Sequence, residues 1–339
     1  MTDRELALVA DIGGTNVRFA LARAGDGGLL LPGSIAHHAV AEFASLVDAA
    51  RAYLAGRGAA PTQAVLAAAG PVTGGAVRIT NNPWVVVAAE VRAALGLARV
   101  RIVNDFAAMS ASIPALDGGA LRALGTAGVP SLDLDTPRVL GVMGPGTGLG
   151  VGILVIRDGQ ARILETEGGH VSFAPTTAEQ AAVQRLLAER FGRVSNERLI
   201  CGAGLLNLYQ ALCTLRGRPA AAATPEAVSA AAAAGADPEA VRAAGLFAEI
   251  LGAIAGDLVL LTGAWDGVYL SGGLVRPMLH WLGQPGFREH FEDKGRFAPA
   301  VARVPTIAVL HESAGLIGAA ALALDARIDT VRHVAGARA

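Results

Sequence analysis

Lysine is almost missing from this chain, because Lys294 is the only lysine among 339 residues. A Walker A loop needs a lysine within GxxxxGK[ST], and a protein kinase needs one on its third strand. Lys294 lies in the segment EDKGRF, far from the glycine-rich turns of the chain. If the protein handles ATP, it therefore uses neither of those two phosphate-binding devices.

Cysteine, net charge and long apolar runs are also scarce. Cys201 and Cys213 have neither metal-ligand spacing nor a disulfide framework, so we expect a reduced, cytoplasmic protein. The formal net charge of -1 argues against a nucleic-acid partner. No apolar run reaches the roughly 18–20 residues of a membrane span. The nearest run, Ile250–Leu261, is interrupted by Asp257, so we expect no membrane segment.

Two glycine-rich turns dominate what is present: DIGGTN at Asp11–Asn16 and GPGTGLG at Gly144–Gly150. Each turn joins two apolar runs that are typical of strands. Glycine lets backbone N–H groups approach an anion closely, so two facing turns would grip a polyphosphate from both sides. An ordinary tight hairpin is the alternative for DIGGTN. The repetition in both halves favours a nucleotide phosphate site.

The first turn offers specific groups to a nucleotide. We expect the Asp11 carboxylate to order the water shell of a Mg²⁺ ion carried by the phosphates. The N–H groups of the turn and the Thr15 hydroxyl would hold phosphate oxygens. The candidate residues here are Asp11, Gly13, Gly14, Thr15 and Asn16.

The rest of the chain alternates expected strands with expected helices, which indicates two α/β lobes with a cleft between them. The segment Ile113–Asp135 is rich in Gly, Pro, Asp and Ala and is interpreted as a connector. Thr176 and Glu179 have capping-box spacing at the start of a helix. Other expected elements are strands at Val65–Ala69, Arg101–Val103 and Val304–Val309, and helices at Phe43–Leu54, Val86–Leu95, Ala178–Phe191 and Ala314–Leu324.

Polar residues follow one of these buried strands. Asn104 and Asp105 come directly after Arg101–Val103, at the end of a parallel strand where α/β folds place ligand contacts. Asp105 has the chemistry to accept the proton of an attacking hydroxyl. It also has the chemistry to cap the helix expected at Phe106–Ile113, and both roles are compatible.

Carboxylates and an imidazole form a third candidate group. EGGH places Glu167 and His170 on either side of two glycines, and Glu197 lies near a helix start. Such groups suit sugar hydroxyls, although Glu197 alone is equally typical of a surface. No second His or Cys lies at ligand spacing from His170, so we predict no protein-held metal.

The ordered motifs DIGGTN, NNPW, VNDF, GPGTGLG, EGGHVSFAP, ERLICGAGL, SGG and FEDKGRF closely resemble the bacterial glucokinase family, from about Leu6 to about Gly318. The resemblance implies a two-lobed, actin-like (ribonuclease H-like) sugar kinase fold with an interdomain cleft. It implies transfer of the ATP γ-phosphoryl group to the 6-hydroxyl of glucose, with Mg²⁺, by a homodimer. The expected small domain spans 1–112, completed by a C-terminal helix at 314–330, and the large domain spans 113–313.

The resemblance also assigns residues. Asp105 matches the catalytic base. The sugar contacts are Asn104, Asp105, Glu167, His170 and Glu197, and the nucleotide elements add Gly146, Thr147, Gly148, Gly272 and Gly273. The related repressor–kinase group typically carries a cysteine-rich zinc motif after its EGGH-like histidine. Val171–Pro175 contains no cysteine, which favours the plain glucokinase group without structural zinc.

Two alternatives stay open at this point. Glucose, mannose and glucosamine differ by one hydroxyl or amine, so a kinase for another hexose or amino sugar is the nearest one. A non-catalytic sugar-sensing regulator is the alternative from a different class.

Overall fold

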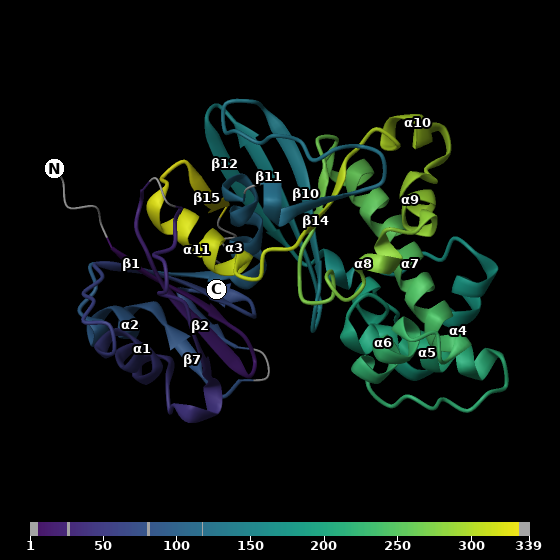
Figure 1. The fold of residues 1–339 in the computed structure, drawn as a ribbon, viewed down its shortest axis with the longest axis horizontal. Coiled ribbons are helices and arrows are strands. Elements are labelled where there is room, and N and C mark those ends of the chain that lie inside the picture. Colours follow the sequence, from purple (N-terminus) through teal and green to yellow (C-terminus); the bar gives the residue numbers. More distant parts are fainter. Residues whose placement is uncertain (1–5, 26–27, 80–81, 117, 332–339) are drawn as a thin grey trace, which may run out of the picture.

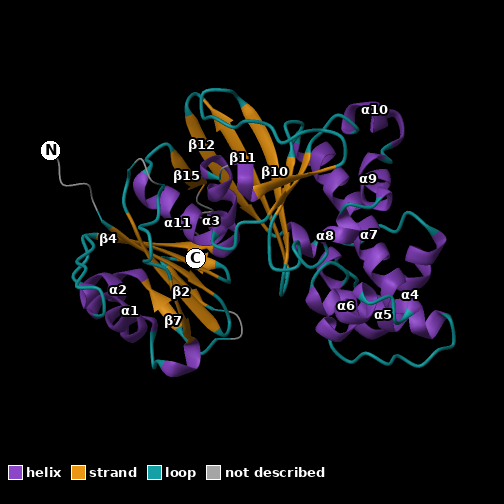
Figure 2. Cartoon of the chain, viewed as in Figure 1, coloured by secondary structure: helices purple, strands orange, loops and turns teal. Residues whose placement is uncertain are grey.

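The computed structural model describes residues 6–25, 28–79, 82–116 and 118–331. Asn81, part of the NNPW motif, lies outside these ranges. In the described chain the strands form sheets of five, seven and three strands, and most helices of the second half gather on one side (Figure 1, Figure 2).

The five-stranded sheet is built from the first third of the chain, in the order β3-β2-β1-β4-β8. β1 pairs antiparallel with β2 and parallel with β4, which pairs parallel with β8. Alternate residues of β1 enter two different cores: Leu8 packs with α1 and α2, whereas Val9 packs on the opposite face. The elements are β1 (Ala7–Ile12), β2 (Asn16–Ala22), β3 (Ala36–Ala39), α1 (Leu46–Ala55), β4 (Gln63–Ala68), α2 (Ala88–Leu95) and β8 (Arg99–Asn104).

The seven-stranded sheet repeats this plan, in the order β15-β12-β11-β10-β13-β14-β9. β10 pairs antiparallel with β11 and parallel with β13, which pairs parallel with β14. The run β12-β11-β10-β13-β14 therefore matches β3-β2-β1-β4-β8 in order and direction. The strands are β9 (Leu121–Leu124), β10 (Arg138–Pro145), β11 (Leu149–Arg157), β12 (Gln160–Thr166), β13 (Val268–Leu270), β14 (Thr306–Val309) and β15 (Ile328–Val331).

Two helices lie between these sheets: α3 (Asp105–Ser112), which follows β8, and α11 (Ala314–Leu324), which follows β14 (Figure 1). They share one core with residues of both sheets. They pack so closely that a Cβ on Gly318 would lie 1.6 Å from the carbonyl oxygen of Ala108. Glycine at this position is therefore required by the helix contact rather than by a turn.

The remaining helices build a bundle beside the seven-stranded sheet, around the long, central α7 (Figure 2). Among the described residues α7 is long and apolar enough to cross a membrane by length and composition, with a mean hydropathy of 1.9, but 67% of that window is buried in the protein. It serves here as a core helix. The bundle contains α4 (Ala178–Phe191), α5 (Gly202–Leu215), α6 (Pro225–Ala233), α7 (Pro238–Thr262), α8 (Leu279–Leu282), α9 (Pro285–Glu292) and α10 (Ala298–Val301).

Several sequence predictions need correction. α11 matches the helix predicted at Ala314–Leu324, but the wider C-terminal helix given for the small domain, 314–330, is wrong beyond Leu324, because β15 joins the seven-stranded sheet beside β12. The connector predicted at Ile113–Asp135 contains β9, which pairs with β14 at the sheet edge. Turn-rich composition hid this short strand. The third sheet, formed by the short strands β5 (Val72–Thr73), β6 (Ala76–Arg78) and β7 (Val85–Val87), also went unpredicted. β7 covers the first two residues of the helix predicted at Val86–Leu95, so that helix, α2, begins only at Ala88.

The cap of α4 lies one residue later than predicted. The Thr177 hydroxyl accepts from the Gln180 N–H, whereas the Thr176 N–H donates to the Gln180 side chain at 2.8 Å. Threonines at adjacent positions made the two alternatives indistinguishable by spacing alone, and Glu179 is instead bound by Arg242.

Candidate active site

Asp105 lies where β8 ends, as the first residue of α3. Its side chain is partly buried, and this burial is the main cause that raises its pKa from 3.8 to about 6. The negative charge of Asp11 adds to the rise and that of Glu167 adds less, whereas the N–H donated by Phe106 at 2.9 Å opposes it. The charges of two carboxylates from other parts of the chain, Asp11 and Glu167, therefore act on Asp105.

Asn104 caps the helix that Asp105 begins. Its side-chain Oδ1 accepts from the N–H groups of Phe106 at 2.8 Å and Ala107 at 3.3 Å. Its Nδ2 donates to the carbonyl of Gly70 at 3.3 Å. The prediction that Asp105 caps this helix is therefore wrong. The helix begins at Asp105 itself, so the cap is the preceding residue, Asn104. The amide of Asn104 fixes the backbone that carries Asp105 and keeps one further N–H donor.

Asp11 is held by a residue that the sequence analysis did not select. Arg18 lies directly opposite Asp11 in the β1–β2 pairing and forms an ion pair with it. The same guanidinium donates to the carbonyl of Glu312 at 2.8 Å. Counting outward from the turn along both strands would have placed Asp11 and Arg18 as cross-strand neighbours.

The first glycine turn is closed by a hydrogen bond from the Gly13 N–H to the Asn16 carbonyl at 2.9 Å. Asn82 donates to the carbonyl of Gly13 at 2.9 Å, which ties the turn to the NNPW motif. Thr15 and Asn16 are exposed, and the Asn16 amide donates to the Thr15 hydroxyl at 3.0 Å. Neither Gly13 nor Gly14 has a positive φ, so the turn does not depend on left-handed backbone at these two positions.

The second turn meets two other segments. Its Gly146 N–H donates to the Gly148 carbonyl at 2.8 Å, and its Gly146 carbonyl accepts from Gly202 at 2.9 Å. SGG lies against the same turn: at Gly272 the φ is +119° and a Cβ would lie 2.7 Å from the Pro145 carbonyl oxygen, so only glycine fits. The predicted nucleotide residues Gly146, Thr147, Gly148, Gly272 and Gly273 therefore come from two loops in contact.

Three of the residues predicted to contact a sugar, Glu167, His170 and Glu197, lie close together. His170 lies between two carboxylates, with Nε2 at 3.8 Å from Glu167 and Nδ1 at 4.0 Å from Glu197. The other oxygen of Glu197 accepts from the Leu149 N–H at 2.9 Å, beside the second glycine turn. Gly169 is required by packing, since a Cβ there would lie 2.1 Å from the Leu149 carbonyl oxygen. His170 and Glu167 remain exposed to solvent. In the described part of the chain, no group of three or more His, Cys, Asp or Glu residues has a geometry that suits a metal ion.

Phe106 joins the two halves of the site. A Cβ on Gly144 would lie 2.2 Å from its ring, and a Cβ on Gly150 would lie 2.4 Å from it. These two glycines are paired across the β10–β11 hairpin and form a notch for the ring. The glycines of GPGTGLG were predicted to bind phosphate. Two of them, Gly144 and Gly150, instead make room for the ring of Phe106.

The topology and these groups together define a two-lobed sugar kinase of the actin-like class. A solved glucokinase from an Antarctic psychrotroph superposes with a TM-score of 0.83 at 34% identity, covering 94% of this chain and 98% of that one. A ROK family glucokinase from Streptomyces griseus, solved with glucose and AMPPNP, shares the fold with a TM-score of 0.62 at 21% identity, covering 94% of this chain and 98% of that one.

The family follows from sequence comparison. The glucokinase family model matches residues 8–326. A glucokinase of Stenotrophomonas maltophilia is 52% identical over 323 residues, covering 95% of this chain and 96% of that protein. The chain belongs to the glucokinase family and is an enzyme that phosphorylates glucose with ATP, which confirms the resemblance, the fold class and the activity predicted from the motifs. The alternative of a non-catalytic regulator is set aside.

Proposed function

We propose that Asp105 is the general base that accepts the proton of the glucose 6-hydroxyl as that oxygen attacks the γ-phosphorus of ATP. The supporting observation is the position of Asp105: its carboxylate is partly buried, the charges of Asp11 and Glu167 act on it, and the adjacent Phe106 packs against the second glycine turn. A pKa of about 6 leaves most of Asp105 ionised at neutral pH and close in proton affinity to its task.

For glucose, we propose that Glu167, His170 and Glu197 bind hydroxyl groups of the sugar other than the one that attacks ATP. The contacts of His170 with both carboxylates support a joint role. Asn104 has one N–H left to donate to a hydroxyl after its contact with Gly70. Its larger role in this proposal is to hold Asp105 in place.

For ATP, the proposed phosphate contacts are the turn at Gly13, Gly14, Thr15 and Asn16 on one side and Gly146, Thr147, Gly148, Gly272 and Gly273 on the other. Mg²⁺ would supply positive charge that neutralises the phosphate oxygens. The residues present fit such an ion, because Asp11 places a second carboxylate near Asp105, and its ion pair with Arg18 is made through one of its two oxygens, Oδ2. We propose that Asp11 holds the ion through water.

Three further proposals complete the account. The division into a small domain of 1–112, completed by α11, and a large domain of 113–313 is supported by the duplicated sheet plan. Assembly as a homodimer rests on the family resemblance alone. A soluble, cytoplasmic location is consistent with the burial of α7 and with the two unpaired cysteines.

The decisive experiment for the base is Asp105→Asn. Asparagine keeps the shape and the acceptor for the Phe106 N–H but cannot take the proton. The expected result is a kcat lower by about 10²–10⁴-fold with glucose binding retained, measured by a coupled assay and by calorimetric titration of glucose. Turnover within a fewfold of the unaltered enzyme would remove Asp105 from this role.

A further inference from the structure

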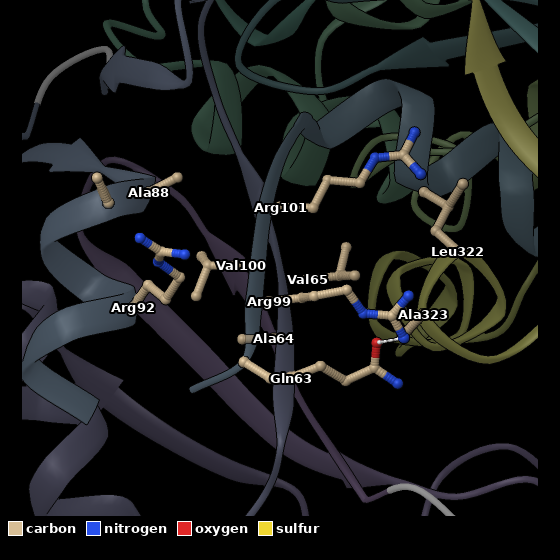
Figure 3. A pocket seen from close by; sticks show the side chains of 12 residues that line it. Gln63, Ala64, Val65, Ala88, Arg92, Arg99, Val100, Arg101, Leu322 and Ala323 are labelled. Carbon is tan, nitrogen blue, oxygen red and sulfur yellow. Dashed lines mark hydrogen bonds between the residues drawn. The ribbon is translucent and has the colours of Figure 1, made fainter. Parts of the chain in front are cut away.

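A cavity of about 520 Å³ lies at the free edge of the five-stranded sheet, and none of the predicted site residues lines it. β8 is the last strand of that sheet, so in the described chain its outer edge pairs with no strand. The cavity extends from α2 across β8 to the end of α11 (Figure 3). Its size is within the range of about 300–1,000 Å³ that is usual for small-molecule sites.

Three arginines line this cavity: Arg92 from α2, and Arg99 and Arg101 from β8. Side chains alternate along a strand, so Arg99 and Arg101 lie on the face toward α11, while Arg92 lies on the other side of β8 (Figure 3). Charged residues on an edge strand often serve to prevent strand pairing. That explanation covers the two arginines of β8 but not Arg92, which lies on a helix.

The arginines differ in how they are engaged. Arg101 pairs with Asp329 at 2.6 Å, and Arg99 donates to the side chain of Gln63 at 3.0 Å. Within the described ranges, no hydrogen bond or ion pair engages the guanidinium of Arg92. Arg92 therefore brings to the cavity a guanidinium charge that no described residue neutralises, whereas Arg101 already has an acidic partner.

We propose that this cavity binds a small molecule with two anionic groups, one on each side of β8. A guanidinium binds phosphate or carboxylate oxygens in a bidentate manner, and one such group on each face matches the placement of Arg92 and Arg99. The apolar side chains of Val65, Val100 and Leu322 would contact the carbon chain between them. A second copy pairing along β8 would instead bring like charges together.

Occupancy of this cavity acts on elements that also hold the reacting carboxylates. β8 ends at Asn104, directly before Asp105. α11 begins next to Asp11, whose Oδ2 would lie 3.1 Å from a Cβ on Gly315. The bound dianion therefore changes kcat for glucose phosphorylation, a part of the proposal that rests on the activity described above.

The test is a calorimetric titration of the full chain, saturated with glucose and ADP so that the active site is filled. Fructose 1,6-bisphosphate, with phosphates at both ends, is compared with fructose 6-phosphate, which has one. The bisphosphate should bind at least about tenfold more tightly. Arg92→Gln and Arg99→Gln should each weaken its binding about tenfold, while the matched control Arg185→Gln, on the exposed face of α4, leaves it unchanged.

Absence of bisphosphate binding, equal binding of the two compounds, or binding unaffected by both arginine variants would overturn the proposed site. Kinetics with saturating ATP and glucose provide the second readout. A change of kcat on adding the bisphosphate, lost in both variants, supports the regulatory role, and binding without any change of kcat overturns that role. Because neither arginine belongs to the catalytic group, both variants should keep the basal activity.

Discussion

At the scale of single residues, the ionised carboxylate of Asp105 lowers the stability of the folded protein. Its burial beside Asp11 raises its pKa to about 6, so the folded state holds the proton more tightly than the unfolded chain does. The stability contributed by this proton is present in full below about pH 4 and is lost as pH rises through about 6. At a pH where Asp105 is ionised, the folded protein therefore carries an unfavourable, partly buried charge.

Asp105→Asn should accordingly stabilise the protein above pH 6 while it removes activity. A shift of about two pKa units corresponds to at most about 3 kcal/mol at pH 8, and the gain should vanish near pH 4. Urea denaturation of both proteins between pH 4 and pH 8 measures this difference. Asp158→Asn, which alters a carboxylate that is 91% exposed, is the control for loss of one charge. A gain in stability that is the same at every pH would contradict the assignment of the shift to Asp105.

His170 is the residue at which the proposed sugar side can be tested against the proposed phosphate side. Its imidazole lies within 4.0 Å of the carboxylates of Glu167 and Glu197. His170→Ala should raise KM for glucose at least about tenfold while changing KM for ATP little, because a site that bonds hydroxyls loses affinity when a partner is removed. Steady-state kinetics with each substrate varied in turn measure both constants, and His37→Ala, on exposed β3, is the control. A selective rise in KM for ATP would place His170 on the nucleotide instead.

At the scale of elements, each sheet receives a helix from the other half. α3 follows the last parallel strand of the first sheet, and its Phe106 occupies the notch of the β10–β11 hairpin. α11 follows β14 of the second sheet, and its first turn lies against Asp11 of the β1–β2 hairpin. The two helices then pack on each other through Gly318. This exchange places Phe106, and with it the adjacent Asp105, against a glycine turn that is distant in sequence.

The notch that holds Phe106 is testable by enlarging a glycine that lines it and reducing the side chain that fills it. Gly150→Ala would push a Cβ to 2.4 Å from the ring, which we expect to cost about 1–3 kcal/mol of stability and to lower kcat by displacing Asp105. Phe106→Leu makes room, so the double variant should recover part of both losses. A double-mutant cycle measured by urea denaturation and by kcat gives the coupling. Gly128→Ala, where a Cβ would meet no atom within 4 Å, is the matched control, and strict additivity of the two changes would refute the notch.

At the scale of the whole molecule, the strand order that is repeated in the two sheets explains which parts of the fold the sequence could predict. Two apolar runs around each glycine turn predicted the two hairpins, and the motif order predicted the family and fold. The pairing of β15 with β12 was not predictable, because a four-residue strand joins its sheet through contacts made far away in sequence. β9 was missed for the same reason.

The candidate site shows the same division. Asp105, Glu167, His170 and Glu197 were selected from their types and motifs, and their proximity is now visible in distances and in the pKa of Asp105. The roles of Arg18 and Phe106 required the strand register and the depth of the glycine notch. Strand register and the depth of the notch depend on packing between distant segments, which the spacing of residues within a motif does not predict.

The most direct test of the account is a coupled assay of the purified protein with ATP and Mg²⁺ against glucose, mannose, glucosamine, fructose and 2-deoxyglucose. Several directional partners for hydroxyl groups predict the highest kcat/KM for glucose, with losses of up to about 10⁴–10⁵-fold wherever the altered hydroxyl is bonded. Release of ADP should match formation of glucose 6-phosphate one to one. A higher kcat/KM for any other sugar of the panel, or no phosphorylation of glucose, would contradict the account.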